Sequence, residues 1–304
     1  MAGSDDQFAS QRAFVCEARP EPLDISAIVV CRNEADKLAD CLRSLRWCDQ
    51  IIVLDLESTD ASRTIAEQWA DRVESRPFSP IVEPLRVEGS LIAKHDWCLF
   101  VDPDEQFPAC MAERIRAVLA GCPDAASVRL PWQFYFKGRR LDGTVWGGRR
   151  RFKQFLVHRK RSRIVPLSLV SSEPLPGHPE IYMLPREENY VRHDWIDSYF
   201  QLFEKHLRYA RKEGESRYER GVRFRWRQLI LSPLRAARTS LVTFDGWRIG
   251  WRGVALSLFF GLFELAGQMS LGGYQWRQRH RGDDLVPCAV SPEADEQPER
   301  RKAA

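Results

Sequence analysis

The sequence predicts an α/β fold in which a mostly parallel sheet is followed by a helical C-terminal region. Two observations on the 304 residues support this prediction. In the first third, short continuous apolar runs alternate with segments whose apolar residues recur at helical spacing, a pattern typical of a parallel sheet covered on both faces. After Trp195 the apolar residues recur only at helical spacing, and no internal repeat is visible.

The individual elements follow from the apolar patterns. Strands are expected at 25–31, 51–55, 97–101, 127–141 and 152–159. Helices are expected at 38–45, 61–70 and 108–119. Pro108 suits the first turn of the third of these helices. A further helix should begin after Trp195, with Gly214 as its C-cap.

Composition and breaks in the pattern predict the domain organisation. We expect a flexible lead at 1–22, one α/β domain at 23–195, a basic and apolar helical region at 196–286, and a disordered tail at 287–304. Hydrophobic residues make up 44% of the chain, enough for a large core. The N-terminus lacks the apolar run of a signal peptide. The eight cysteines include no CxxC pair, which favours buried, reduced thiols and a cytoplasmic setting.

The net charge of +4 is unevenly distributed. Residues 208–252 hold twelve Lys or Arg against four Asp or Glu, which favours contact with phosphates, anionic lipid or nucleic acid. The apolar segment 254–271 is about 27 Å long as a helix, but Glu264 and Gln268 make a membrane span costly. Two alternatives stay open, an interfacial helix on an anionic membrane and a helix packed in a soluble core. The adjacent apolar helix favours lipid over nucleic acid.

Acidic residues follow three successive predicted strands: Glu34, Asp55, and the pair Asp102 and Asp104. Parallel strands bring their carboxyl ends to one edge of the sheet, where ligands bind. A Mg²⁺ or Mn²⁺ that bridges a diphosphate would neutralise the acids of the DPD sequence. The competing interpretations are a solvated turn for the pair and a helix cap for Asn33 and Glu34. The glycine motifs of dinucleotide-binding domains and P-loops are absent from the sequence.

A resemblance to a known family accompanies these residues. Residues 27–70, AIVVCRNEADKLADCLRSLRWCDQIIVLDLESTDASRTIAEQWA, resemble the opening of family 2 glycosyltransferases, especially bacterial lipopolysaccharide-core glucosyltransferase-like members. The resemblance continues through DWCLFVDPDE and, more loosely, through FKGRRLDGTVWGG and FLVHR to TFDGWRIGWRGVALSL. It implies a GT-A fold and transfer of a hexose, with inversion, from a nucleotide-diphosphate sugar with Mg²⁺ or Mn²⁺. The implied acceptor is a glycan or a lipid-linked molecule in the synthesis of lipopolysaccharide or another cell-surface polysaccharide. The apolar segment 254–271 and the arginines on either side of it lead us to expect a peripheral position on the inner face of the cytoplasmic membrane.

The resemblance also assigns roles to single residues. It implies that Glu34 and Asp55 bind the nucleotide, and that Asp102 contacts both the nucleotide-sugar and the metal. Asp104 would be the more direct metal ligand. Arg86 would touch the diphosphate, with a solvated helix face as the competing interpretation. Leu56, Glu57 and Pro103 replace residues that are usually small in the family.

The acceptor hydroxyl needs a general base opposite the leaving diphosphate. Relatives often carry a His-Glu pair in the middle region, and the matching residue is Glu173, without the histidine. His178, His193 and Asp194 are alternatives, each of which also has an ordinary structural interpretation. The alternative functions are transfer to a polyprenyl phosphate and a catalytically silent scaffold of the same fold.

Overall fold

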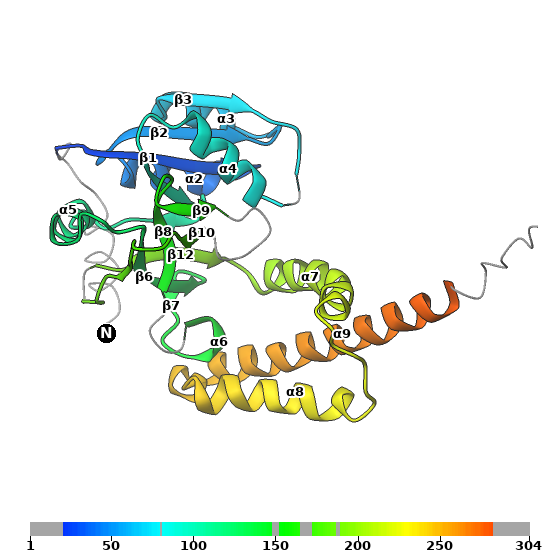
Figure 1. Cartoon of the computed structure of the whole chain (residues 1–304). Helices are drawn as coiled ribbons and strands as arrows, with labels where there is room; N and C mark the ends of the chain where they lie inside the picture. Colours follow the sequence, from blue (N-terminus) through cyan, green and yellow to red (C-terminus); the bar gives the residue numbers. More distant parts are fainter. Residues whose placement is uncertain (1–20, 80, 148–151, 165–171, 187–188, 282–304) are drawn as a thin grey trace, which may run out of the picture.

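The computed structural model describes residues 21–79, 81–147, 152–164, 172–186 and 189–281. The predicted tail at 287–304 and nearly all of the predicted lead at 1–22 lie outside the described residues. The described part folds as a twisted sheet covered by helices, with three long helices gathered on one side (Figure 1).

The main sheet has ten strands, with eight in the order β3-β2-β1-β4-β8-β6-β12-β5 and with β7 and β11 paired to β6. Its parallel half consists of β1 (Leu23–Cys31), β2 (Cys48–Asp55), β3 (Arg72–Ser75) and β4 (Trp97–Val101). β8 (Phe152–His158) runs antiparallel to both β4 and β6 (Ser127–Phe136), and β12 (Val191–Ile196) pairs parallel with β6. The sheet is therefore mostly parallel, as the sequence predicts.

Short strands complete the β-structure: β5 (Glu105–Gln106), β7 (Arg139–Arg140) and β11 (Glu180–Tyr182) in the main sheet, and a separate hairpin of β9 (Ser162–Ile164) and β10 (Ser172–Pro174). The helices around the sheet are α2 (Ala35–Ser44), α3 (Ser62–Trp69), α4 (Glu83–Ile92), α5 (Met111–Gly121) and the short α6 (Thr144–Gly147).

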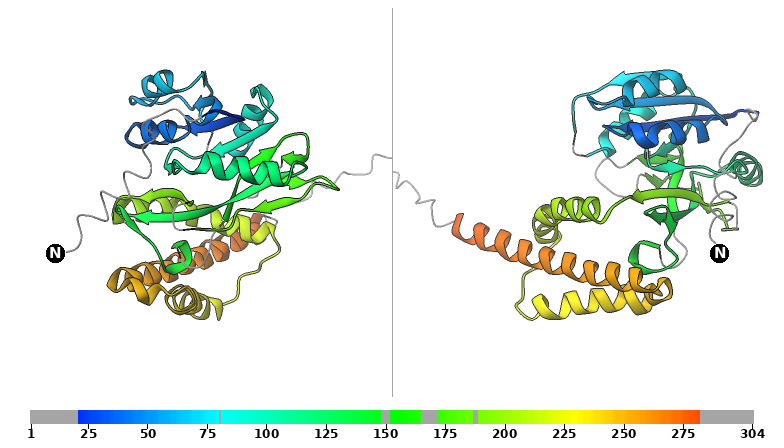
Figure 2. Two further views of the ribbon diagram at one scale, coloured as in Figure 1. Left: turned by 90° about the vertical axis from the view of Figure 1, so that its left-hand side faces the viewer. Right: turned by 180° about the vertical axis from the view of Figure 1, so that it is seen from behind.

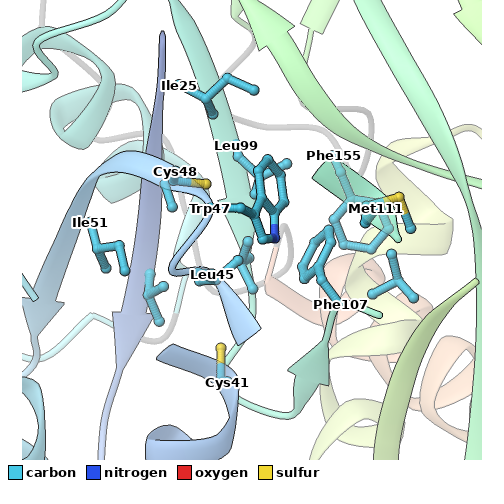
Figure 3. Packing of buried hydrophobic residues seen from close by; sticks show 14 of the residues in the cluster. Ile25, Cys41, Leu45, Trp47, Cys48, Ile51, Leu99, Phe107, Met111 and Phe155 are labelled. Atoms are coloured by element: carbon cyan, nitrogen blue, oxygen red, sulfur yellow. The ribbon is translucent and has the colours of Figure 1, made fainter. Parts of the chain in front are cut away.

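Both faces of β1, β2 and β4 are buried. Along β1, Val29 belongs to one core cluster and its neighbour Ile28 to the other, as expected where successive side chains point to opposite faces. The larger cluster is centred on aromatic rings (Figure 3), with Phe107 5.9 Å from Trp47 and 5.4 Å from Phe155 between ring centroids. The buried thiols predicted from apolar runs, such as Cys41, are buried and free.

Three long helices follow the sheet: α7 (Tyr199–Glu219), α8 (Gln228–Arg238) and α9 (Trp251–Arg281). The turns η1 (Thr239–Thr243) and η2 (Gly246–Ile249) join α8 to α9. Figures 1 and 2 show α8 and α9 side by side, and α7 and α8 both pack on α9.

The structure departs from the expected elements at several points. β3 and α4 were not expected. β3 is half exposed and has no apolar run that would predict a strand. The strand expected at 127–141 is divided into β6 and β7 by a turn at Lys137 and Gly138, both with positive φ. The helix expected at 108 begins at Met111, after a turn in which the Met111 N–H donates to the Pro108 carbonyl.

Gly214 is not a C-cap. It lies inside α7, which continues to Glu219. A Cβ at this position would stand 2.4 Å from the carbonyl carbon of Ser270 in α9. The glycine is therefore needed for the close approach of two helix backbones, and the helix does not end there.

Candidate active site

The register of the parallel strands decides which side chains meet at the carboxyl edge of the sheet. Asp55 pairs with Cys31 across β2 and β1, and Val101 pairs with Val29 across β4 and β1. The loops that follow β1, β2 and β4 therefore emerge at one edge. These loops carry Glu34, Asp55 and the DPD sequence.

The loops after β1 and β2 are tied together by hydrogen bonds. Asn33 has a positive φ of 54°, and its side-chain oxygen accepts from the backbone N–H of Thr59 at 2.8 Å. The backbone N–H of Glu34 donates to Ser62 Oγ at 2.8 Å. Asn33 is thus not the helix cap that the sequence suggested. Glu34 is the N-cap residue of α2, and its side chain makes no capping hydrogen bond.

A buried cluster of charges surrounds Asp102. Lys153 of β8 approaches Asp102 Oδ2 at 2.7 Å and Glu105 Oε1 at 2.6 Å, and Arg86 of α4 contacts Asp102 Oδ1. The backbone N–H of Asp102 donates to Glu105 at 2.9 Å. Burial acts to raise the pKa of Asp102, but Lys153 and Arg86 hold it well below its usual range. Both carboxylate oxygens of Asp102 therefore contact cations.

The sequence did not identify Glu105 or Lys153 as candidate site residues. Glu105 is fully buried, and burial raises the pKa of its carboxyl to about 7. Burial acts to lower the pKa of Lys153, but Asp102 and Glu105 raise it above its ordinary value. Lys153 lies 51 residues from Asp102, so no local pattern could have revealed the pair.

Asp104 meets a histidine from the other half of the sheet. His193 Nε2 of β12 lies 3.0 Å from Asp104 Oδ2, and the backbone N–H of Asp194 donates to the Asp104 carbonyl at 2.8 Å. The imidazole is stacked on Trp132, with ring centroids 4.7 Å apart. Its Nδ1 is buried and has no hydrogen-bond partner among the described residues. His193 was considered only as an alternative base in the sequence.

Asp104 and His193 fit a divalent cation. A carboxylate oxygen and an imidazole nitrogen face each other, and the stacked ring keeps the imidazole in place. Magnesium sites use one or two protein carboxylates and take further ligands from substrate phosphates, whereas an imidazole nitrogen suits a transition-metal ion better. Within the described residues, no group of three or more His, Cys, Asp or Glu side chains is arranged to hold a metal. A metal here would therefore need the diphosphate to complete its coordination.

A pocket of about 510 Å³ opens beside this pair. One wall comes from the sheet edge and α2, with Asn33, Glu34, Asp36, Lys37 and Asp104. The facing wall comes from the end of β12 and from α7, with Trp195, Ile196, Asp197, Gln201, Glu204, Lys205 and Arg208. Lys37 joins the walls, because its Nζ donates to the Asp194 carbonyl at 2.7 Å and pairs with Asp197 at 2.8 Å. Burial, together with Asp104, raises the pKa of Glu34 to about 7.

Four predicted site residues are not among those that line the pocket: Arg86 and Asp102, which belong to the charge cluster described above, and Asp55 and Glu173. Asp55 is 1% exposed at the end of β2, where the Ser58 N–H approaches its carboxylate at 3.4 Å. Glu173 is exposed on β10, in the separate hairpin, next to residues that the structure does not describe. Neither is among the residues that line the pocket. Their roles stay predictions.

The alternative bases already have structural partners. Arg192 donates two hydrogen bonds to the Asp194 carboxylate, at 2.8 and 2.9 Å. His178 Nδ1 lies 3.0 Å from the carbonyl of Asp124. His193 faces Asp104 and is better placed to hold a cation than to accept a proton from an acceptor.

This fold and this strand-end site define a nucleotide-sugar transferase architecture of the GT-A type, with a C-terminal helical extension. Residues 26–166 match the family described as Glycosyl transferase family 2. The α/β domain of this chain belongs to that family.

Solved and curated relatives agree with this assignment. The mannosyltransferase PcManGT from Pyrobaculum calidifontis, in complex with GDP-Man and Mn²⁺, has a TM-score of 0.51 at 12% identity and covers 88% of this chain and 93% of that one. That likeness shows the fold. An uncharacterized glycosyltransferase of Rickettsia felis is 34% identical over 97 residues, which are 32% of this chain and 34% of the relative.

The lipopolysaccharide core biosynthesis glycosyltransferase LpsC of Rhizobium meliloti is 26% identical over 122 residues, covering 38% of this chain and 44% of LpsC. The similarity to these two curated relatives therefore spans between a third and a half of their length.

Proposed function

We propose that this chain is an inverting glycosyltransferase that moves a hexose from a nucleotide-diphosphate sugar to a glycan or lipid-linked acceptor. The acceptor belongs to lipopolysaccharide or another cell-surface polysaccharide. The observation that carries the proposal is the Asp104–His193 pair beside a pocket at the carboxyl edge of the sheet. The family of the domain and the function named for LpsC support it.

We assign the following roles to the site residues. Glu34 and Asp55 contact the nucleotide. Asp104 and His193 would hold Mg²⁺ or Mn²⁺, and a bound ion would supply positive charge that stabilises the leaving diphosphate. Asp102, fixed by Lys153 and Arg86, keeps the DPD turn in place and faces the nucleotide-sugar. Arg86 acts on the diphosphate through Asp102, because its guanidinium already contacts that carboxylate.

The donor and metal roles are tested together by a thermal-shift panel of UDP-, GDP-, ADP- and dTDP-sugars with and without Mn²⁺. A donor at one hundred times its Kd stabilises the fold by about 2.7 kcal/mol. Asp104→Ala should abolish the Mn²⁺-dependent part of this shift while the unliganded protein melts as before. Asp40→Ala is the control, because Asp40 is an exposed acid on α2 outside the pocket. An Asp104→Ala protein that transfers sugar at the wild-type rate would refute the assignment.

The same measurements separate the alternative functions. A catalytically silent scaffold would show no metal-dependent hydrolysis of any donor. Transfer to a polyprenyl phosphate would show donor hydrolysis and a preference for that acceptor over a glycan.

We also propose that the chain lies peripherally on the inner face of the cytoplasmic membrane, through α9 and its surroundings. α9 is long and apolar enough to cross a membrane by length and composition. Its exposed apolar side chains fall at intervals that place them on one face: Trp251, Val254, Leu258, Leu262, Met269 and Trp276. One apolar face with tryptophans at both ends is typical of a helix that lies in the interface.

The other side of α9 is occupied by protein. Glu264 accepts from Arg217 of α7 at 2.7 and 2.9 Å, and Ser232 of α8 also donates to it. The acid that made a membrane span costly is thus paired between three helices, which supports an interfacial rather than a spanning position. Residues 221–281 contain ten arginines and only two acids, Asp245 and Glu264, so anionic lipid headgroups suit this region.

Flotation with anionic liposomes tests this contact. The wild-type chain should float at low salt and less at high salt, because salt screens the arginines. Leu258→Asp with Leu262→Asp should abolish flotation. Leu91→Asp is the control, because Leu91 is 75% exposed, more than Leu258 at 60% and Leu262 at 64%, but lies on α4. A full-length chain that stays at the bottom at low salt would rule out the membrane contact.

A further inference from the structure

α8 carries an exposed apolar stripe of its own. Ile230 and Leu234 lie about one helical turn apart and are 67% and 64% exposed. Arg227 and Arg238 are exposed on the α8 surface next to this stripe. The membrane contact proposed above uses the apolar side chains of α9 and gives these two residues no role.

α8 and α9 run antiparallel. Ser257 Oγ, near the start of α9, donates to Ser240 Oγ, just after the end of α8, at 2.9 Å. At the other end, the Phe224 N–H, just before α8, donates to the Gln275 side chain at 2.9 Å. The end of α8 therefore lies beside the start of α9, as Figures 1 and 2 show.

The contacts with α9 define the direction in which the α8 stripe points. The residues of α8 that contact α9 include Ser232, Pro233 and Ala237. Successive residues of a helix are rotated by about 100°. Ile230 and Leu234 therefore lie about 100° from the centre of this contact, measured in the direction in which the chain winds from its N-terminus.

The exposed stripe of α9 is rotated by the same amount. The residues of α9 that contact α8 include Ser257, Gly261 and Gln268. Leu258 and Leu262 lie about 100° from the centre of this contact in the same winding direction. On two antiparallel helices, equal rotations in the winding direction turn both stripes to one side of the pair. The stripes thus form a single surface, the α8–α9 surface, of Ile230, Leu234, Leu258 and Leu262.

Charge favours an anionic membrane over a second copy of the chain as the partner of the α8–α9 surface. Residues 221–281 contain ten arginines and two acids, and one of these acids, Glu264, is turned toward Arg217 of α7. A second copy on the same surface would bring two arginine-rich regions together, which opposes association. A bilayer with anionic headgroups offers both an apolar layer and negative charge.

α7 packs on the side of α9 that points away from the α8–α9 surface. Arg217 of α7 pairs with Glu264 at 2.7 Å, and Gly214 of α7 packs against the backbone of Ser270. Glu264 and Ser270 are centred roughly 160° round α9 from its exposed stripe. α9 therefore separates α7 from the surface that would meet the membrane.

The pocket lies on the far side of α7. The residues of α7 that contact α9 include His206, Gly214 and Arg217. Those that line the pocket are Gln201, Glu204, Lys205 and Arg208. The two sets are centred about 180° apart round the helix. Both α9 and α7 thus stand between the α8–α9 surface and the pocket, and Figure 1 shows α8 and α9 on the side of α7 away from the parallel strands.

We infer that α8 and α9 together form the membrane-binding surface, and that α9 and α7 hold the pocket about 20 Å from it, since each helix is about 10 Å across. The headgroup layer of one leaflet is only about 5–8 Å thick, so the pocket lies beyond the headgroups. This rests on the proposed function and deepens it. The acceptor hydroxyl must be carried beyond the headgroup layer, and a phosphate attached directly to a lipid tail does not reach the pocket.

Flotation of the full chain with liposomes of phosphatidylglycerol and phosphatidylethanolamine in equal parts tests the role of α8. Ile230→Asp with Leu234→Asp should weaken binding at least about tenfold, because two acids replace apolar side chains in the contact. Leu91→Asp with Leu184→Asp is the matched control, because these leucines are 75% and 72% exposed and lie outside α7, α8 and α9. The control should bind like the wild type. Melting temperatures verify that each variant folds.

The outcomes distinguish this inference from the membrane contact proposed above. If Leu258→Asp with Leu262→Asp abolishes flotation and the α8 variant floats like the wild type, the role of α8 is wrong and the proposed contact through α9 stands. If the wild-type chain does not float, both are wrong. A dimer that sediments without liposomes and dissociates in the α8 variant would assign the α8–α9 surface to a second copy.

Arginine modification by phenylglyoxal, with and without the same liposomes, tests the spacing. Bound liposomes should slow the modification of Arg227 and Arg238 several-fold and leave that of Arg208, on the pocket wall, unchanged. Equal protection of Arg208 would overturn the spacing, as would transfer of sugar to a polyprenyl phosphate in these liposomes. If the protection is as expected but no donor is bound or hydrolysed, the proposed transfer fails while the membrane geometry stands.

Discussion

Removing Lys153 should destabilise the protein more than removing any surface lysine. Its Nζ lies 2.7 Å from Asp102 and 2.6 Å from Glu105, and its side chain is only 17% exposed. Lys153→Met keeps the apolar stem but leaves the fully buried Glu105 without its cation. Breaking a buried ion pair in this way costs about 3–5 kcal/mol. At about 2 °C per kcal/mol, the melting temperature should fall by about 6–10 °C.

The loss of stability caused by Lys153→Met should be larger at high pH than at low pH. Burial raises the pKa of Glu105 to about 7 even with Lys153 present, and loss of the lysine should raise it further. A buried acid with a raised pKa binds its proton more readily in the folded state, so stability falls as pH rises from the unfolded pKa through the folded one. The variant should therefore differ from the wild type less at pH 5.5 than at pH 8.

Two further variants make the experiment specific. Glu105→Gln in the Lys153→Met background removes the unpaired charge and should recover part of the lost stability. Lys160→Met is the matched control, because Lys160 is 70% exposed in its pair with Asp96, and such surface pairs contribute about 0–1 kcal/mol. Thermal melts at the two pH values measure all four proteins. A Lys153→Met protein that melts within 2 °C of the wild type at pH 8 would refute the reasoning.

Three other variants have defined outcomes. Gly214→Ala should cost roughly 1–3 kcal/mol, because its Cβ would meet the α9 backbone at 2.4 Å, whereas Gly121→Ala, with nothing within 4 Å, should be neutral in the same thermal melts; equal melting of the two would contradict the packing argument. Asp55→Ala should weaken binding of free nucleotide without changing the metal preference, and unaltered affinity would remove Asp55 from the site. Glu173→Gln should suppress transfer and spare donor binding. If transfer persists, the base lies elsewhere, with Glu204 on the pocket wall as the next residue to test.

The sequence by itself determined the parts of this protein that depend on local periodicity. Continuous apolar runs such as 25–31 are typical of strands covered on both faces, so β1, β2 and β4 of the parallel half of the sheet were predictable. The carboxyl ends of such strands share an edge, so the approach of Glu34, Asp102 and Asp104 followed without coordinates. Glu264 was also identified as the residue that argues against a membrane span.

Only the tertiary structure decided how distant residues meet. Lys153 pairs with Asp102, and His193 faces Asp104 from 89 residues away in the chain. These contacts depend on the order in which β8, β6 and β12 join the sheet, and side-chain spacing carries no record of that order. Gly214 is a second example. The sequence predicted that it ends a helix, whereas it lies where α7 crosses α9. A glycine indicates a position where a Cβ is unfavourable, but the sequence does not show whether the cause is a helix end or a close backbone contact. α7 lines the pocket with Gln201, Glu204, Lys205 and Arg208 because the buried His206 ring, packed against Trp146, Trp195 and Phe259, fixes the rotation of the helix.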